Sequence, residues 1–411
     1  MTQHQISKTL KSLVIFRHLL EDETIQKWIR LDGCDQDDPE QIIERYADFA
    51  CTLLQNGSNL TRYLLTLILE DDNIYLHRIC RGESTADLDQ CLQRELTLLQ
   101  QISRFDGEPL RRQAGDETLF CWQTEAIDFQ AAYQEHLAKI HTRGFGIFAR
   151  YHMFILSDDG TPVPIKHPDP QRMDELFGYK SERQKIIRNT QALLQGRPAN
   201  NVLLYGDAGT GKSSTIKALA NEFRKDGLRL IELKKNQLYR IPELIDSLSD
   251  NPLKFILFLD DLTFTSDDRD FCTLKAILEG GVSSRGSNVA IYVTSNHRHL
   301  IKETLQDRQG DEISVGDKIQ EIASLSARFG LNITFSRPDK QLYSEIVCNL
   351  ARDAGIQLDE QTLIIRAEAF AIRHGGRNPR TAKQFVDLLL SGVEQAEDVY
   401  KRQITYSSSN G

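Results

Sequence analysis

Apolar positions in the first 142 residues recur every three to four residues, the spacing of one helix face. The stripe that opens the chain consists of Leu10, Leu13, Phe16, Leu19 and Leu20. A second stripe runs from about 85 to 102. A helix is expected to start at Asp38, because Pro39 suits a first helical position and Gln41 would complete a capping box. The pattern predicts a mostly helical N-terminal domain over residues 1–150, which we expect to bind a partner or substrate.

The pattern changes after this domain. Residues 145–156 are rich in aromatic and aliphatic side chains and predict a strand, and the Pro, Gly and Asp residues of 158–170 favour a linker. Beyond them, short apolar runs alternate with helical patterns, which is typical of a parallel sheet whose strands are joined by helices. The apolar runs are 201–205, 228–233, 255–259, 289–294 and 333–335.

The last part of the chain is again helical in pattern. Pro338, Asp359 and Pro379 each precede apolar residues spaced three to four apart, which predicts three helices without strands. The chain would thus be an α/β protein with a parallel-sheet core over 151–336 and a small helical subdomain over 337–400. We expect the Ser-rich end, 401–411, to be a flexible tail.

Composition narrows the class of protein. The 411 residues are 40% hydrophobic and 27% charged, as in ordinary globular proteins. The formal net charge of -9 argues against non-specific binding to nucleic acid. No apolar run is long enough to span a membrane, and residues 1–5 lack the pattern of a secretion leader, so we do not expect secretion by that route. The seven cysteines form no CxxC pair, so we expect reduced thiols, a cytoplasmic location and no metal site built from protein ligands alone.

The clearest chemical motif follows the run at 201–205. It fits the phosphate-binding pattern G-x-x-x-x-G-K-[ST] and is followed by a helical run. Its residues are Gly206, Asp207, Ala208, Gly209, Thr210, Gly211, Lys212 and Ser213, with Ser214 next. Glycines let backbone N–H groups surround phosphates, and the helix N-terminus adds its positive end. We predict that Lys212 bridges the β- and γ-phosphates and that Ser213 ligates Mg²⁺.

Two acids follow the apolar run at 255–259. A buried strand that ends in Asp260 and Asp261 would present both carboxylates at the edge of the sheet where ligands bind. Asp260 is predicted to hold Mg²⁺, and Asp261 to orient or deprotonate an attacking water. The next apolar run ends at Asn296, whose amide would contact that water and the γ-phosphate. Two arginines, Arg328 and Arg380, are candidates for neutralising charge in phosphoryl transfer.

This order of motifs resembles the AAA+ P-loop ATPases: Walker A, Walker B, sensor 1 at Asn296, an arginine finger at Arg328 and sensor 2 at Arg380 before a helical lid. Within that superfamily the chain is similar to the bacterial domain-of-unknown-function family 815. The matching stretches include 176–179, 189–190, 198–207, 259–262, 292–300 and 326–331. The resemblance implies that Gly178 and Tyr179 lie against the adenine, and it extends the same role to Ile346.

Two residues depart from the superfamily pattern. Walker B usually ends in Asp-Glu, whereas this chain has Asp260 and Asp261, and the shorter second acid suggests slow or partner-stimulated hydrolysis. Ala327 stands where an acid is common before the arginine finger. Such an acid would orient Arg328, so its absence weakens that assignment relative to Lys212.

Three functional hypotheses follow. The first is hydrolysis of Mg-ATP in a homo-oligomer, with Arg328 acting in trans, to drive conformational change in an unknown protein or nucleic-acid client. The second is an ATP-gated loader or scaffold with little turnover. The third is action on DNA through a small basic cluster, His297, Arg298, His299 and Lys302, against which the acidic balance argues.

Overall fold

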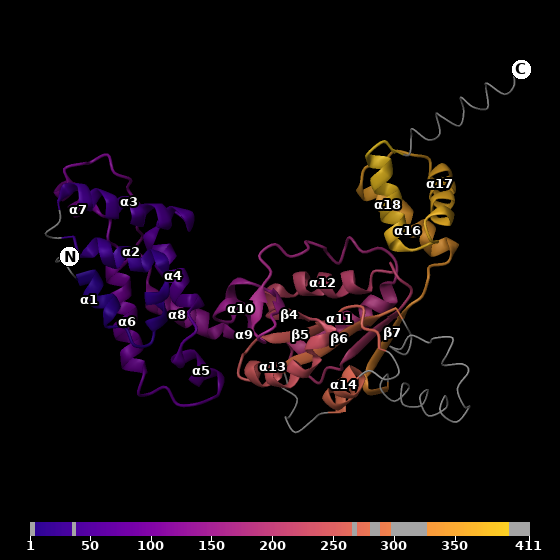
Figure 1. The fold of residues 1–411 in the computed structure, drawn as a ribbon, viewed down its shortest axis with the longest axis horizontal. Helices are drawn as coiled ribbons and strands as arrows, with labels where there is room; N and C mark the ends of the chain where they lie inside the picture. The colour runs from indigo at the N-terminus through magenta and orange to yellow at the C-terminus, as the bar shows by residue number, and fades with distance from the viewer. Residues whose placement is uncertain (1–4, 35–37, 265–268, 280–287, 297–326, 394–411) are drawn as a thin grey trace, which may run out of the picture. The chain divides into compact units, whose positions relative to one another are not determined.

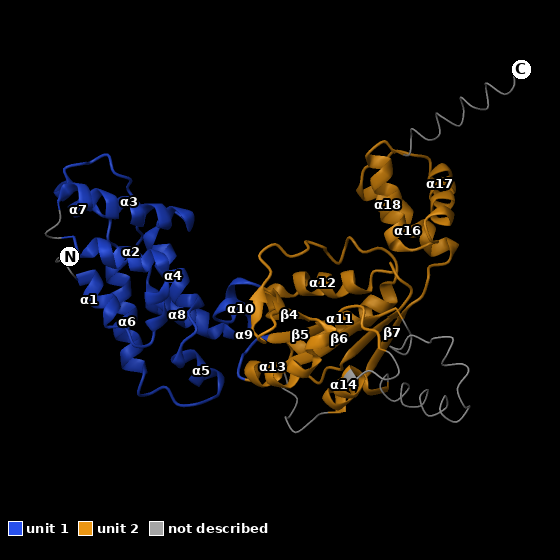
Figure 2. Ribbon diagram, in the orientation of Figure 1, with its two compact units in different colours: residues 1–151, 250–253 blue, residues 152–249, 254–411 orange. Residues whose placement is uncertain are grey.

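The computed structural model describes residues 5–34, 38–264, 269–279, 288–296 and 327–393. The basic cluster at 297–302 and the tail at 401–411 lie outside the described residues. The chain forms two compact units (Figure 2). Unit 1 comprises residues 1–151 and 250–253, and unit 2 comprises residues 152–249 and 254–411.

The described residues of unit 1 form helices, with one isolated β-bridge between Asn59 and Gln123 (Figure 1). Its helices are α1 (Gln5–Lys11), η1 (Arg17–Glu21), α2 (Glu23–Asp32), α3 (Pro39–Gln55), α4 (Leu60–Glu70), α5 (Ile74–Cys80), α6 (Asp89–Ile102), α7 (Glu108–Ala114), α8 (Phe129–Ala138), α9 (Ile140–Arg143) and α10 (Ile147–Arg150). Helix α3 begins at Pro39 as expected, but the Asp38 side chain makes no capping hydrogen bond. The capping box is therefore wrong, although the helix start is confirmed.

Aromatic side chains pack together in the core of unit 1. Trp28 stacks on Phe49 with ring centroids 5.9 Å apart, and Trp122 meets the same Phe49 edge to face at 4.9 Å. Tyr46, Trp28 and Phe49 are fully buried. Such rings bury large apolar areas, and here they pack within a core in which most of the other buried residues are Leu and Ile.

The segment predicted as one strand over 145–156 is two elements. Residues Ile147–Arg150 form the short helix α10, and only Met153–Leu156 form a strand, β1. Gly144 and Gly146 precede the helix with φ values of 70° and 61°, a left-handed conformation that glycine adopts without steric cost. These two glycines let the chain turn at a point where the apolar pattern alone predicts that a strand continues.

Unit 2 is built on a seven-stranded sheet in the order β2-β1-β4-β5-β6-β3-β7. Its strands are β1 (Met153–Leu156), β2 (Pro162–Pro164), β3 (Val202–Gly206), β4 (Leu228–Leu233), β5 (Lys254–Leu259), β6 (Val289–Ser295) and β7 (Leu331–Phe335). All neighbours are parallel except β1 and β2. The α/β parallel sheet predicted from the sequence is confirmed.

The Pro- and Gly-rich segment is not only a linker. Its residues 162–164 pair with β1 as an antiparallel edge hairpin, with Phe154 opposite Pro164 and Leu156 opposite Pro162. Proline has no backbone N–H to donate, so it is tolerated only at the edge of a sheet. The two prolines therefore end the sheet on this side.

Helices accompany the sheet, and three more form the subdomain at the C-terminal end (Figure 1). The helices between the strands are α11 (Lys180–Leu194), α12 (Lys212–Glu222), η2 (Arg224–Asp226), η3 (Lys235–Arg240), α13 (Ile241–Leu248) and α14 (Arg269–Glu279). The subdomain, called the lid below, contains α16 (Lys340–Asp353), α17 (Glu360–Arg373) and α18 (Pro379–Leu390). It has its own apolar core around Tyr343, Phe370 and Phe385. No described helix is long and apolar enough to cross a membrane.

Candidate active site

The strand order brings the predicted site residues together. Strand β6 lies between β3, which leads into the phosphate-binding loop, and β5, which ends before Asp260. Parallel strands end at the same edge of a sheet, so Asn296, just after β6, sits between Lys212 and the acid pair. A cavity of about 860 Å³ opens at this edge and is lined by the loop, both acids, Asn296 and residues of the lid.

The phosphate-binding loop has the backbone that its glycines allow. Gly206, Gly209 and Gly211 have φ values of 137°, 79° and 90°. A Cβ at Gly206 would lie 2.1 Å from the carbonyl oxygen of Phe335 on β7, so only glycine fits there. Lys212 begins α12 immediately after the loop.

The Lys212 ammonium is buried, with the residue 6% exposed, and its donors are fully used. Its Nζ donates to the carbonyl oxygens of Gly206 and Asp207 at 2.7 and 2.8 Å and to Oδ1 of Asn296 at 3.0 Å. Burial lowers the pKa of Lys212, and Asp261, Asp207 and Asp260 oppose that effect. The positive charge is thus held at the cavity by the surrounding carboxylates.

Asp260 is connected to both the loop and the next strand. Its Oδ1 accepts from the Ser213 hydroxyl at 2.5 Å and from the Thr294 hydroxyl at 2.6 Å. Thr294 also accepts from the backbone N–H of Asp261 at 2.8 Å. Sequence reasoning missed Thr294, which fixes both acids, because its role depends on β5 and β6 being neighbours.

Asp261 has an unusual backbone, with φ at 48°. This left-handed region costs an L-residue about 1 kcal/mol or more, and Asp tolerates it better than most residues. The Asp261 carboxylate accepts from the Asn296 amide at 2.6 Å. Asn296 therefore bridges Lys212 and Asp261, with its oxygen toward the cation and its nitrogen toward the anion.

The two arginines have different surroundings. Arg380 is the second residue of the last lid helix, lines the cavity and donates its backbone N–H to the carbonyl of Gly209 at 3.1 Å. Arg328 does not line the cavity of its own chain. Its guanidinium pairs with Glu279 of α14 at 2.5 Å and is about one-third exposed.

The residues just before those predicted to contact adenine line the cavity. They are Leu176 and Phe177, and Ile346 and Leu350 of the lid line it too. Gly178 and Tyr179 are not among the lining residues; Gly178 packs on Ile346, and the Tyr179 hydroxyl donates to Ser336. The lining thus combines apolar side chains from residues 176–177 and the lid with the phosphate-binding loop, the acids and Lys212.

The oxygen atoms of Ser213 and Asp260 are suitable ligands for a magnesium ion. Ser213 and Asp260 offer hydroxyl and carboxylate oxygens within hydrogen-bond distance of each other. Mg²⁺ is usually held by one or two such ligands together with substrate phosphates. Among the described residues, no group of three or more His, Cys, Asp or Glu side chains could hold a metal alone.

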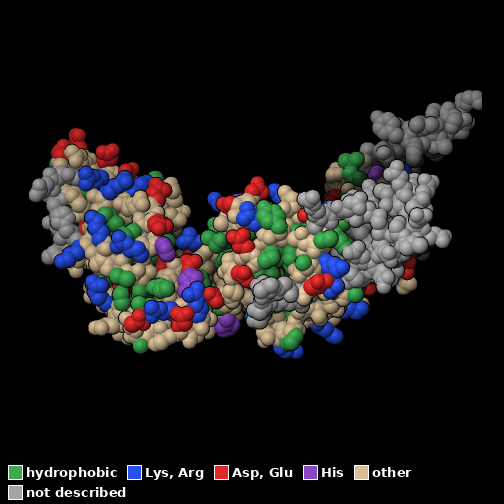
Figure 3. All heavy atoms as spheres, turned by 60° about the horizontal axis from the view of Figure 1, so that its bottom comes forward, with side chains coloured by type: hydrophobic (Ala, Val, Ile, Leu, Met, Phe, Trp, Pro, Cys, Tyr) green, Lys and Arg blue, Asp and Glu red, His purple; other side chains and the backbone are tan. Residues whose placement is uncertain are grey.

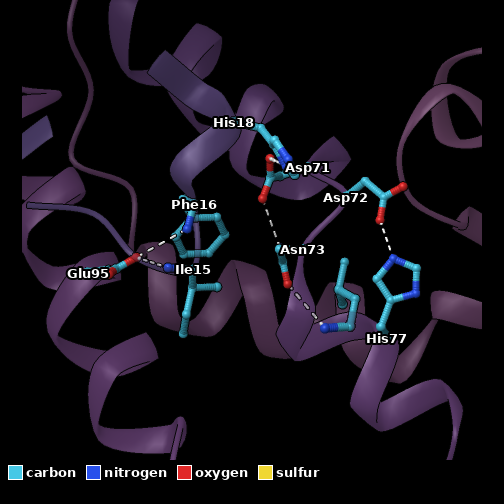
Figure 4. A network of polar contacts seen from close by, with 9 residues as sticks. Ile15, Phe16, His18, Asp71, Asp72, Asn73, His77 and Glu95 are labelled. Atoms are coloured by element: carbon cyan, nitrogen blue, oxygen red, sulfur yellow. Dashed lines mark hydrogen bonds and ion pairs between the residues drawn. The ribbon is translucent and has the colours of Figure 1, made fainter. Parts of the chain in front are cut away.

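Unit 1 also contains a buried polar network, shown in Figure 4. The fully buried Glu95 accepts from the backbone N–H groups of Val14, Ile15 and Phe16 at 2.6, 3.1 and 3.2 Å. Asp71 accepts from Asn73 at 3.0 Å, and burial raises its pKa to about 6. These carboxylates are engaged by groups of their own unit, so we assign them a structural role.

Comparison with protein families matches residues 149–393 to DUF815, described as a protein of unknown function. Among curated proteins, an AAA-ATPase of Arabidopsis thaliana is 27% identical over 168 residues, or 35% of this chain and 33% of that protein. The Holliday junction branch migration complex subunit RuvB of Mycoplasmopsis pulmonis is 24% identical over 194 residues, or 47% of this chain and 58% of that protein.

A third relative is the replication factor C large subunit of Staphylothermus marinus, which is 32% identical over 72 residues, 17% of this chain and 16% of that protein. The chain thus spans less than two thirds of each of these relatives. Among solved structures, the RuvB branch migration motor of Thermotoga maritima matches with 14% identity and a TM-score of 0.39, covering 56% of this chain and 67% of that one. The fold assignment rests on the strand order of unit 2.

Proposed function

Because the chain belongs to the DUF815 family and is related to AAA+ P-loop ATPases, we propose that it binds Mg-ATP between the sheet of unit 2 and the lid and hydrolyses it. The main observation behind this proposal is a hydrogen-bonded cluster of polar side chains that lines the cavity. Lys212, Asn296 and Asp261 are joined by hydrogen bonds of 3.0 and 2.6 Å, and Ser213 is joined to Asp260 beside them.

Each residue of the cluster has a task in this proposal. The backbone N–H groups of residues 208–214 and the Lys212 ammonium bind the phosphates. Ser213 and Asp260 hold Mg²⁺, which would neutralise charge on the phosphate oxygens. Asp261 accepts a proton from the attacking water or orients it, and Asn296 positions that water. Arg380 brings a positive charge from the lid.

The proposal includes a homo-oligomer. Arg328 is outside the cavity of its own chain, and the short strand β7 follows it at an edge of the sheet. An arginine in this position can act on a nucleotide held by a neighbouring copy. Conformational change in the oligomer would then be delivered to an unknown protein or nucleic-acid client, with unit 1 as the region that contacts it.

A second function is favoured by one observation. Asp261 is shorter than the usual Glu, so its carboxylate reaches less far, and in this structure it is held by Asn296 at 2.6 Å. A protein that binds ATP and turns it over rarely would act as an ATP-gated loader or scaffold. Binding without phosphate release, with or without added DNA or cell-extract proteins, would favour this second function.

The test is phosphate release from Mg-ATP by the full chain and its Lys212→Ala variant. Lys217→Ala is a matched control, because Lys217 lies on the same helix, pairs with Glu232 and does not line the cavity. We expect the first variant to lose ATP binding and hydrolysis, and the control to keep both. A Lys212→Ala protein that works like the parent would overturn the proposal.

The trans role of Arg328 has its own test. We expect Arg328→Ala to bind ATP but release little phosphate, and mixing it with Lys212→Ala to restore part of the activity. Glu279→Gln is the control, since it removes only the partner of Arg328 within the chain. Normal hydrolysis by Arg328→Ala, without complementation in the mixture, would rule out the interface role.

A further inference from the structure

A buried arginine, Arg183, lines the cavity together with Leu176 and Phe177, and neither the sequence motifs nor the proposed chemistry uses it. Arg183 lies in the first turn of α11 and is 5% exposed. Among the described residues, no carboxylate is within ion-pair distance of its guanidinium. Burial lowers the pKa of Arg183 to about 10, so the group stays charged at neutral pH.

The guanidinium is engaged by backbone carbonyls that follow one another in sequence. Its Nη1 donates to the carbonyl oxygens of Leu176 and Gly178, the latter at 2.6 Å, and its Nη2 donates to that of Phe177 at 3.4 Å. We name residues 176–178 the base loop. A planar group with several fixed donors is suited to holding three successive carbonyls in one arrangement.

The base loop needs such support because its backbone is irregular. Gly178 and Tyr179 have φ values of 74° and 50°, both left-handed, and Tyr179 is not a glycine. The turn is also packed tightly: a Cβ at Gly178 would lie 3.0 Å from Ile346 of the lid. A strained turn of this kind persists only where surrounding contacts fix it.

Arg183 also reaches the phosphate-binding loop through one residue. Its Nε donates to the Thr215 hydroxyl at 3.4 Å, and that hydroxyl donates to the carbonyl of Gly211 at 2.8 Å. Gly211 itself packs near the guanidinium, at 3.8 Å from Nη2 to a Cβ built at that glycine. The same side chain therefore contacts the base loop and the wall of the phosphate-binding loop.

We propose that Arg183 is a positioning residue that fixes the base loop against the phosphate-binding loop and so makes binding depend on the nucleotide base. This inference rests on the proposed function, since it concerns the same cavity. A ligand that contacts both loops gains from the correct spacing between them. A ligand that has only phosphates does not.

The test compares ATP with inorganic tripolyphosphate, both with Mg²⁺, by calorimetric titration of the full chain. In Arg183→Lys the charge is kept but the fork of donors is lost. We expect the dissociation constant for ATP to rise by about tenfold and that for tripolyphosphate by less than about twofold. Arg188→Lys, an exposed change on the same helix, should alter neither.

A second variant keeps the test decisive if Arg183→Lys fails to fold. Gly178→Ala disturbs the base loop from the opposite side, and we expect the same selective loss of ATP binding. Equal weakening of both ligands, or unchanged ATP binding, in folded variants would overturn the role of Arg183. If the parent binds neither ligand, the proposed function itself fails, a result distinct from any behaviour of the variants.

Discussion

Both units bury charged groups, but they satisfy them differently. In unit 1, Glu95 receives three backbone N–H groups, of which those of Ile15 and Phe16 are drawn in Figure 4, and Asp71 receives the amide of Asn73. In unit 2, Lys212, Asn296 and Asp261 contact one another along the wall of an 860 Å³ cavity. Both arrangements are hydrogen-bonded within the fold, but only the second lies along a cavity that a ligand would fill.

This difference distinguishes charged groups that stabilise the fold from charged groups that would bind a ligand. A carboxylate that accepts several backbone donors contributes to stability, and its removal leaves those donors without a partner. Charges gathered at a cavity favour a ligand of matching chemistry. The outer surface of unit 1 shows no comparable gathering in the face drawn in Figure 3, where acidic and basic side chains are interspersed.

The largest expected effect is on catalysis. Asp261→Asn removes the carboxylate that would orient or deprotonate water, so we expect phosphate release to fall by roughly 100-fold or more. ATP binding should persist, because Lys212 and the loop are unchanged. Parallel measurements of phosphate release and ATP titration check this, and undiminished release would assign the catalytic base elsewhere. The same variant would serve as a trap for bound clients.

The next effect is on stability, in unit 1. Glu95→Gln keeps the size of the side chain but replaces a charged acceptor of three N–H groups with a neutral amide. We expect the free energy of unfolding to fall by about 2 kcal/mol. Denaturant unfolding measures this loss. ATP hydrolysis per folded molecule should not change; a specific loss of activity in folded Glu95→Gln would contradict the structural role.

Replacing Asp71 with Asn should raise the stability of the protein at pH 8, which is the opposite of the effect expected for Glu95→Gln. Its pKa is raised from 3.8 to about 6 by burial, so the folded state binds a proton that the unfolded state has lost. Stability should therefore fall as pH rises from about 4 to 6, by at most about 3 kcal/mol. Asp71→Asn should remove this decline and stabilise the protein at pH 8 but not at pH 4. Unfolding midpoints at the two pH values test the prediction, and equal effects at both would refute it.

The smallest effect concerns the backbone of Asp261. Because its φ is 48°, a longer Glu should cost about 1 kcal/mol more than Asp in this conformation. We expect Asp261→Glu to lower stability slightly, with no large gain in hydrolysis. Thermal unfolding and phosphate release measure both quantities. A fully stable variant with strongly increased turnover would mean that side-chain length, and not backbone geometry, explains the acid found here.

The sequence predicted the local features of unit 2 well. The loop around Lys212, the acids after β5 and Asn296 after β6 are short motifs whose spacing is fixed by one strand and its turn. Thr294 and Arg183 could not be found in this way. Their contacts depend on which strands are neighbours and on a left-handed turn at Gly178, neither of which a one-dimensional pattern records.

Two errors of the sequence interpretation have the same origin. Residues 145–156 have one apolar pattern, but glycines at 144 and 146 turn the chain into α10 before β1. The prolines at 162 and 164 indicated a linker, yet they pair with β1 at an edge, where a missing N–H has no consequence. In both segments the residue pattern alone missed a competing feature, which is a glycine turn in the first and tertiary pairing in the second.

Hydrogen exchange of the full chain, with and without saturating Mg-ATP, tests the central contrast most directly. We expect slower exchange at residues 206–214 and at the ends of β5 and β6 when ATP is present. We expect no change at residues 13–16 and 91–95, where Glu95 already has its hydrogen-bond partners. Unchanged exchange at 206–214, or protection confined to residues 13–16 and 91–95, would show that the cavity of unit 2 is not the nucleotide site.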